Sequence, residues 1–149
     1  MVAQMLAPAA VLVLWSLIML AWMALTRFPA MAKLGTDLSN AEPGGRGQDL
    51  EDTLPAKVNW KSHNFSHLME QPTIFYPAVI ILAMMGASGF DMLLAWVYVA
   101  VRILHSIWQA TVNKLPVRFS LFIISTIALL ILAVRAVCAT LFHNPVVIS

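Results

Sequence analysis

The chain has 149 residues, of which 60% are hydrophobic and only 11% are charged, and its mean hydropathy is +0.82. Soluble domains carry about 25% charged residues, so this composition excludes an ordinary water-exposed surface. The formal net charge is +2, and five of the nine Lys/Arg residues fall between Arg27 and Lys61. Such clustering indicates topology signals and not a nucleic-acid-binding surface.

Four apolar stretches are long enough to cross a bilayer, which takes about 20 mainly apolar residues for about 30 Å of hydrocarbon. Since every backbone amide in lipid must be satisfied within the protein, we expect each stretch to be a helix. The sequence therefore predicts an all-α membrane protein, with one domain over residues 1–149 and four transmembrane helices. The predicted spans are 6–25, 72–89, 92–110 and 119–142.

The first span lacks a preceding basic region and is too long for the apolar core of a signal peptide, so we expect it to be retained. A polar loop at about 28–71 follows it. Within this loop, 35–57 holds five of the seven acidic residues and is expected to be solvated, with at most one short helical turn. Residues 58–71 are amphipathic and predict an interfacial extension of the second helix.

The Lys/Arg residues are unevenly divided between the two sides of the predicted bundle. The first and third loops carry basic residues, whereas both tails and the second loop carry none. The positive-inside rule then places loops one and three in the cytoplasm and both termini outside. No internal repeat is evident, which disfavours a repeat-built transporter. The loop residues are Arg27, Lys33, Arg46, Lys57 and Lys61, then Lys114 and Arg118.

Two sets of polar residues occur where an apolar surface would be expected. Ionisable groups at membrane depth are costly and usually face a bundle interior or a wet cavity. The spacings within each set are three and four, so each set shares one helical face. By the predicted topology both sets and one further arginine lie toward the same side, where they could form one ligand site. They are His63, His67 and Glu70; Arg102, His105 and Gln109; and Arg118.

Structural interpretations of these residues stay open. Glu70 and Arg102 fit an ion pair between the second and third helices, and His63 fits a solvated interfacial position. Three basic residues could extend their charged ends to the lipid headgroups. These are Lys114, Arg118 and Arg135.

A metal site is the other interpretation of the histidines. His63, His67, Glu70 and His105 could supply imidazole and carboxylate ligands. No second ligand motif of similar specificity accompanies them, and Arg102 would repel a cation, so we expect no metal. The single cysteine, Cys138, excludes an intramolecular disulfide.

Two ordered motifs resemble a known family. Residues 64–76 read NFSHLMEQPTIFY, and residues 95–106 read AWVYVAVRILHS, followed by Thr111, Asn113 and Arg118-Phe119. These segments are similar to the second and third helices of the membrane-associated proteins in eicosanoid and glutathione metabolism (MAPEG). The similarity is to the bacterial, microsomal glutathione transferase-like members, and it covers roughly residues 60–136.

The resemblance implies a left-handed four-helix bundle that assembles as a homotrimer, with sites between neighbouring protomers near the cytoplasmic face. It implies glutathione as co-substrate, a lipophilic small-molecule substrate, contact with membrane lipid, and a bacterial inner membrane with periplasmic termini. Membership of a larger membrane complex stays open.

The resemblance also implies roles for individual residues. Glu70 would receive the glutathione amine or a partner arginine, and Arg102 would bind a carboxylate or pair with Glu70. His105 would contact the tripeptide, Tyr76 closes the first motif as a further ligand contact, and Arg118 would hold the sulfur. A guanidinium beside a thiol favours the reactive thiolate.

Three positions depart from the family pattern. His63 and His67 stand where animal glutathione-using members carry Arg and Asn, and Gln109 stands where eicosanoid synthases carry a tyrosine. We therefore expect weaker or altered glutathione binding, with all three still ligand contacts. Two functions follow: a glutathione transferase or peroxidase with Arg118 as catalytic residue, or a non-catalytic lipid-binding or accessory subunit in which the polar residues hold the trimer together.

Overall fold

The computed structural model describes residues 2–35 and 43–142, and this part of the chain is helical and contains no strand. Apolar runs without internal turn signals account for the long helices. In chain order the elements are α1 (Val2–Lys33), the 3₁₀ turn η2 (Gly47–Leu50), α2 (Ala56–Leu68), α3 (Pro72–Met84), α4 (Gly89–Thr111) and α5 (Leu115–Leu141).

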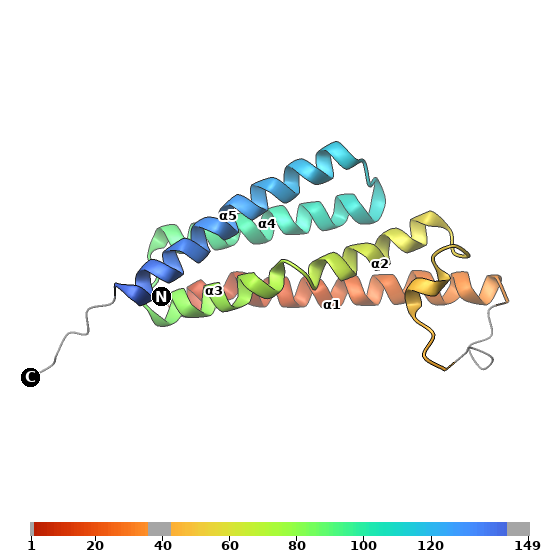
Figure 1. The fold of residues 1–149 in the computed structure, drawn as a ribbon, viewed down its shortest axis with the longest axis horizontal. Coiled ribbons are helices and arrows are strands. Elements are labelled where there is room, and N and C mark those ends of the chain that lie inside the picture. The colour runs from red at the N-terminus through yellow and green to blue at the C-terminus, as the bar shows by residue number, and fades with distance from the viewer. Residues whose placement is uncertain (1, 36–42, 143–149) are drawn as a thin grey trace, which may run out of the picture.

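The helices form an elongated bundle in which all run along the long axis (Figure 1). Helix α1 packs against α2, α3 and α4, and α5 packs against α4 and α3. The start of α1, the α3–α4 turn and the end of α5 lie at one end, whereas the α4–α5 turn lies toward the other (Figure 1). Buried residues of α1 recur every seven positions, as expected for one stripe facing the bundle. They are Met5, Leu12 and Met19.

Helices α1, α4 and α5 are long and apolar enough to cross a membrane. Helices are therefore observed over the predicted 6–25, 92–110 and 119–142, of which the last ends at Leu141, but α1 continues to Lys33, beyond the predicted end and into the predicted loop. Their outward side chains stay exposed in the isolated bundle: Leu14, Leu93 and Leu130 are 60%, 59% and 61% accessible. Apolar side chains exposed to this extent on membrane-length helices fit contact with lipid.

The second predicted crossing, at 72–89, differs from the others. Helix α3 has 13 residues and ends at Met84, so it spans only about 20 Å of the roughly 30 Å of hydrocarbon. Pro72 stands in its first turn, and Gly86, with a φ of +85°, follows its end. Helix α2 precedes it along α1 (Figure 1). A fourth crossing thus needs the end of α2, and it stays a prediction.

The polar loop folds back on the bundle where it is described. Its predicted helical turn is observed as η2. Arg27 of α1 donates to the carbonyl of Gly47 and to Ser62 Oγ (2.9 Å), and Asn59 donates to the carbonyl of Glu51 (2.7 Å). The remaining predicted loop residues, 36–42, and the tail 143–149 lie outside the described residues.

Candidate functional site

A small cavity lies where α2, α4 and α5 meet, toward the α4–α5 end of the bundle. Its volume is about 180 Å³. The imidazoles of His67 and His105 stack with their ring centroids 5.0 Å apart, and Phe122 lies 5.5 Å from His67. Arg118 lines the same cavity, so the structure brings together three predicted site residues: His67, His105 and Arg118. The lining residues are His67, His105, Leu115, Arg118, Phe119 and Phe122.

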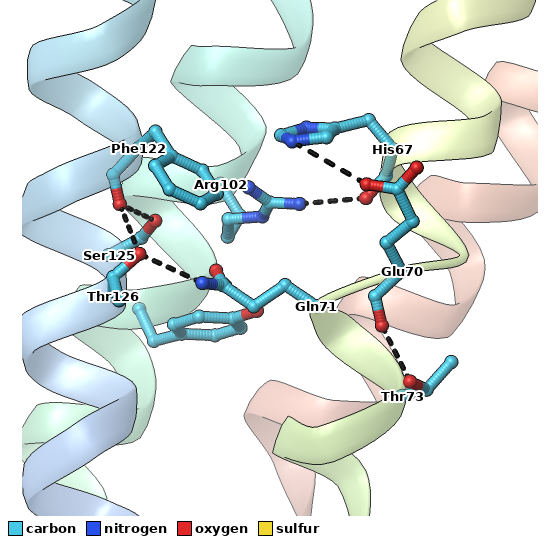
Figure 2. A network of polar contacts seen from close by, with 9 residues as sticks. His67, Glu70, Gln71, Thr73, Arg102, Phe122, Ser125 and Thr126 are labelled. Atoms are coloured by element: carbon cyan, nitrogen blue, oxygen red, sulfur yellow. Dashed lines mark hydrogen bonds and ion pairs between the residues drawn. The ribbon is translucent and has the colours of Figure 1, made fainter.

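Arg102 is fully buried beside this cavity. Its Nη2 donates to the main-chain carbonyl of His67 at 2.9 Å (Figure 2). Its Nε and Nη1 have no partner among the described residues. A buried guanidinium that meets one neutral acceptor lacks the anion that would compensate its desolvation. The arrangement is therefore suited to an anionic group that comes from a ligand or from another chain.

Glu70 does not supply that anion in this structure. Its side chain is 67% exposed, and its Oε2 lies 3.9 Å from Nε2 of His67 (Figure 2). Across the described ranges no ion pair joins Glu70 to Arg102, so the pair that the sequence left open as one interpretation is not formed within this chain. The turn at 69–71 between α2 and α3 places Glu70 on the surface, next to the buried Arg102.

A polar row holds the α2–α3 turn in place (Figure 2). Gln71 Nε2 donates to Thr126 Oγ1 of α5 at 2.8 Å, and the Tyr98 hydroxyl of α4 donates to Gln71 Oε1 at 3.5 Å. Tyr98 is itself buried and stacks on Phe75 of α3 at 4.3 Å. No role for Gln71 or Thr126 was predicted from the sequence. The signal that could have identified them is a hydroxyl or amide side chain in an apolar stretch.

A second polar junction ties α1, α2 and α4 together. The buried Ser106 Oγ accepts hydrogen bonds from Asn64 Nδ2 (2.7 Å) and Trp15 Nε1 (3.0 Å). Gln109 is buried one turn further along α4, and its Oε1 is unpaired within the described part of the chain, as is Nε2 of His105. These two unpaired atoms could each form a hydrogen bond with a polar ligand or with a partner chain.

Arg118 is positioned by the turn between α4 and α5. It is half-buried, lines the cavity, and donates from Nη1 to Asn113 Oδ1 at 2.7 Å. Asn113 has a φ of +56°, a left-handed conformation that few residues other than glycine and asparagine adopt readily. Lys114 in the same turn is exposed, and its contact with headgroups stays a prediction.

Five of the eight predicted site residues do not line the cavity, and two of these, His63 and Tyr76, contact groups outside it. His63 is exposed on α2, and its Nε2 lies 3.0 Å from Oε1 of Glu51 in the polar loop. Tyr76 is half-buried in α3, where its ring packs edge-on against Phe75 at 6.0 Å. Glu70, Arg102 and Gln109 are also outside the lining, whereas His67, His105 and Arg118 belong to it.

Arg135 corrects a further expectation. The sequence predicted a side chain that extends to the headgroups, but Arg135 of α5 pairs with both oxygens of the buried Asp91 and donates to Ser88 Oγ at 3.1 Å. Asp91 and Ser88 also form a capping box that starts α4. The spacing of Ser88 and Asp91 is a sequence signal for the start of α4, but it does not identify Arg135 as the partner of Asp91. The cluster lies at the opposite end of the bundle from the cavity.

The cavity suits an anion better than a cation. Arg102 bonds to the main chain of His67 and Arg118 lines the cavity, so two guanidinium groups adjoin the stacked histidines. A guanidinium that is partly shielded from water stabilises thiolates and carboxylates. The chemistry that this arrangement favours is binding and activation of an anionic or acidic group next to an aromatic wall.

Comparison with known proteins gives one match. A model of the MAPEG family matches residues 5–138, which includes every cavity residue and the cluster at the far end. Comparisons with curated proteins and with solved structures gave no match.

Proposed function

The chain belongs to the MAPEG family of membrane proteins, and on that premise we propose that it is a membrane-bound glutathione transferase or peroxidase acting on lipophilic electrophiles. The observation that carries the proposal is the fully buried Arg102, whose Nε and Nη1 lack a partner among the described residues beside a cavity lined by Arg118. That arrangement fits a substrate with carboxylates and a thiol, as glutathione has.

In this proposal Arg118 pairs with the sulfur of glutathione and lowers the pKa of the thiol, which is about 8.5 in water. The thiol proton leaves to solvent, and the thiolate attacks the electrophile: a carbon–sulfur bond forms as the leaving group departs with its electron pair. Arg102 binds a glutathione carboxylate, and Glu70 receives the amine. His67, His105 and Gln109 contact the tripeptide, whereas Tyr76 and His63 need a neighbouring copy to do so.

We also propose that the protein works as a homotrimer of left-handed bundles with its sites between protomers. The cavity of about 180 Å³ is smaller than the 300 Å³ or more of most small-molecule sites, so it admits a thiol arm but not a whole tripeptide. A site completed by a second copy removes this mismatch. The localisation proposed is a bacterial inner membrane, with four crossings, periplasmic termini and loops one and three in the cytoplasm.

Turnover of a chloronitroarene with glutathione tests the catalytic role of Arg118. We expect Arg118→Ala to lower kcat about a hundredfold, because it removes the charge that stabilises the thiolate. The KM for glutathione should change less than about tenfold, since Arg102 still binds the carboxylate. Arg118→Lys, which keeps a point charge, should fall between the two. Equal turnover in wild type and Arg118→Ala would contradict this mechanism.

A second candidate, a lipid-binding or accessory subunit without catalysis, is favoured by two observations. His63 bonds to Glu51 and not toward the cavity. An apolar groove of about 260 Å³ also lies between α3 and α5, lined by residues including Pro77, Ile81 and Val137. Under this function Glu70→Ala or Arg102→Ala would disperse the trimer, because each removes one partner of a charge pair between copies.

A further inference from the structure

The residue at the α4–α5 turn must satisfy an unusual backbone. Among the described residues Asn113 is the one non-glycine with a positive φ, at +56°. Its N–H donates to the carbonyl of Trp108 at 2.8 Å, which closes α4, and the Trp108 indole donates to the carbonyl of Lys114 at 3.2 Å. Glycine would meet the backbone requirement with less strain than asparagine, so the backbone alone does not explain the side chain.

The Asn113 side chain has its own partner. Its Oδ1 accepts the hydrogen bond from Arg118 Nη1 at 2.7 Å, five residues along the chain. Arg118 is half-buried, and at the cavity it faces His67 of α2 and His105 of α4. An arginine side chain has many rotamers, so an acceptor in the α4–α5 turn restricts Arg118 to the rotamer that bonds to it, and this rotamer lines the cavity.

The chemical type of the acceptor matters as much as its place. An amide oxygen is neutral, so it holds the guanidinium without cancelling its charge. A carboxylate in the same position would form an ion pair and would weaken the field of Arg118 at the cavity. An asparagine in a left-handed turn therefore meets both requirements, since it tolerates this backbone and leaves Arg118 cationic.

We propose that Asn113 is the positioning residue of Arg118: it sets the α4–α5 turn through its backbone and aims the charged guanidinium into the cavity through its amide oxygen. This inference rests on the proposed function, because it assigns to the aimed guanidinium the task of stabilising the glutathione thiolate.

Three variants at the position separate the backbone role from the side-chain role. Asn113→Gly keeps the turn and removes the acceptor, and it should raise the pKa of bound glutathione's thiol by about one unit. Its kcat should fall about tenfold, with the KM for glutathione within about threefold of wild type. Asn113→Asp keeps the turn and the contact but neutralises Arg118, and it should raise the thiol pKa at least as far. Asn113→Ala removes the acceptor and also strains the left-handed backbone, so it should lower both kcat and the yield of folded protein. The ultraviolet absorbance of the thiolate against pH gives the thiol pKa directly.

A double-mutant cycle tests whether Asn113 acts through Arg118. In the Arg118→Ala background, Asn113→Gly should cause no further loss of kcat and no further shift of the thiol pKa. Lys114→Gln, an exposed change in the same turn, is the matched control and should behave as wild type. Helix content by circular dichroism and oligomer size by gel filtration should be unchanged in Asn113→Gly.

The outcomes divide the two proposals. An unchanged thiol pKa and kcat in Asn113→Gly, or losses that add fully to those of Arg118→Ala, would overturn the positioning role and leave the transferase proposal intact. Glutathione that does not bind the wild type, or binds with a thiol that titrates as in water, would overturn both. A shifted thiol in the wild type that reverts in Asn113→Gly supports both.

Discussion

At the scale of single residues, two arginines lie at the cavity in different positions: Arg118 lines it, and Arg102 is buried beside it. Arg102 is fully buried with one neutral acceptor, the carbonyl of His67, and Arg118 is half-buried with another, the amide of Asn113. Neither is paired with a carboxylate within the described ranges. Neither guanidinium is therefore compensated by a carboxylate within these ranges, whereas Arg135 at the other end is paired with Asp91.

Replacement of Arg102 by methionine tests whether that charge serves binding or stability. We expect Arg102→Met to weaken glutathione binding more than tenfold, because a carboxylate loses its charge-assisted partner. The thermal midpoint of helix unfolding should stay the same or rise, since an apolar side chain of similar size removes an uncompensated buried charge. Calorimetry and circular dichroism measure the two effects. A lower midpoint with unchanged affinity would show a structural role, and Arg102→Lys serves as the charge-retaining control.

At the scale of elements, the turns of the bundle carry its polar interactions. The α3–α4 turn is held to α5 by Ser88, Asp91 and Arg135. The α2–α3 turn is held to α5 by Gln71 and Thr126. Each contact joins the end of one helix to the side of another. The two contacts thus tie the turns at both ends of α3 to α5.

The far-end cluster should contribute to stability and not to binding. Asp91→Ala removes both the helix cap and the partner of Arg135, and we expect it to lower the free energy of unfolding by about 2 kcal/mol, a value kept small because Arg135 is 40% exposed. Asp91→Asn keeps the acceptor for the Ser88 N–H and should lose about half as much. Denaturant titration in detergent measures both. Reduced glutathione affinity in a folded Asp91→Asn variant would contradict the separation of the two ends.

The helices could be predicted from the sequence because long apolar runs have few alternatives in a bilayer. The convergence of His67, His105 and Arg118 followed from their spacing and from the side on which each was expected. The pairing of Asp91 with Arg135 could not be predicted, since 44 residues separate them and single-residue burial does not select a partner. Likewise, the outward position of Glu70 depends on the break between α2 and α3, for which the sequence offered only Pro72.

At the scale of the whole molecule, the cavity of the single chain is small for the proposed substrate. Its volume of about 180 Å³ is less than a tripeptide requires, and the exposed Glu70 lies beside the cavity. We therefore expect native mass spectrometry of the detergent-solubilised protein to show a trimer, with glutathione on trimers and absent from monomers. Monomers that bind glutathione as tightly as trimers would show that the site is complete within one chain.

The most direct test of the proposed function is isothermal calorimetry of glutathione with the purified wild type and, in parallel, Arg118→Ala. We predict binding that saturates at no more than one glutathione per protomer, and binding to Arg118→Ala weakened by less than about tenfold because Arg102 remains. No heat of binding at millimolar glutathione, with the trimer intact, would contradict the transferase function and favour a lipid-binding subunit.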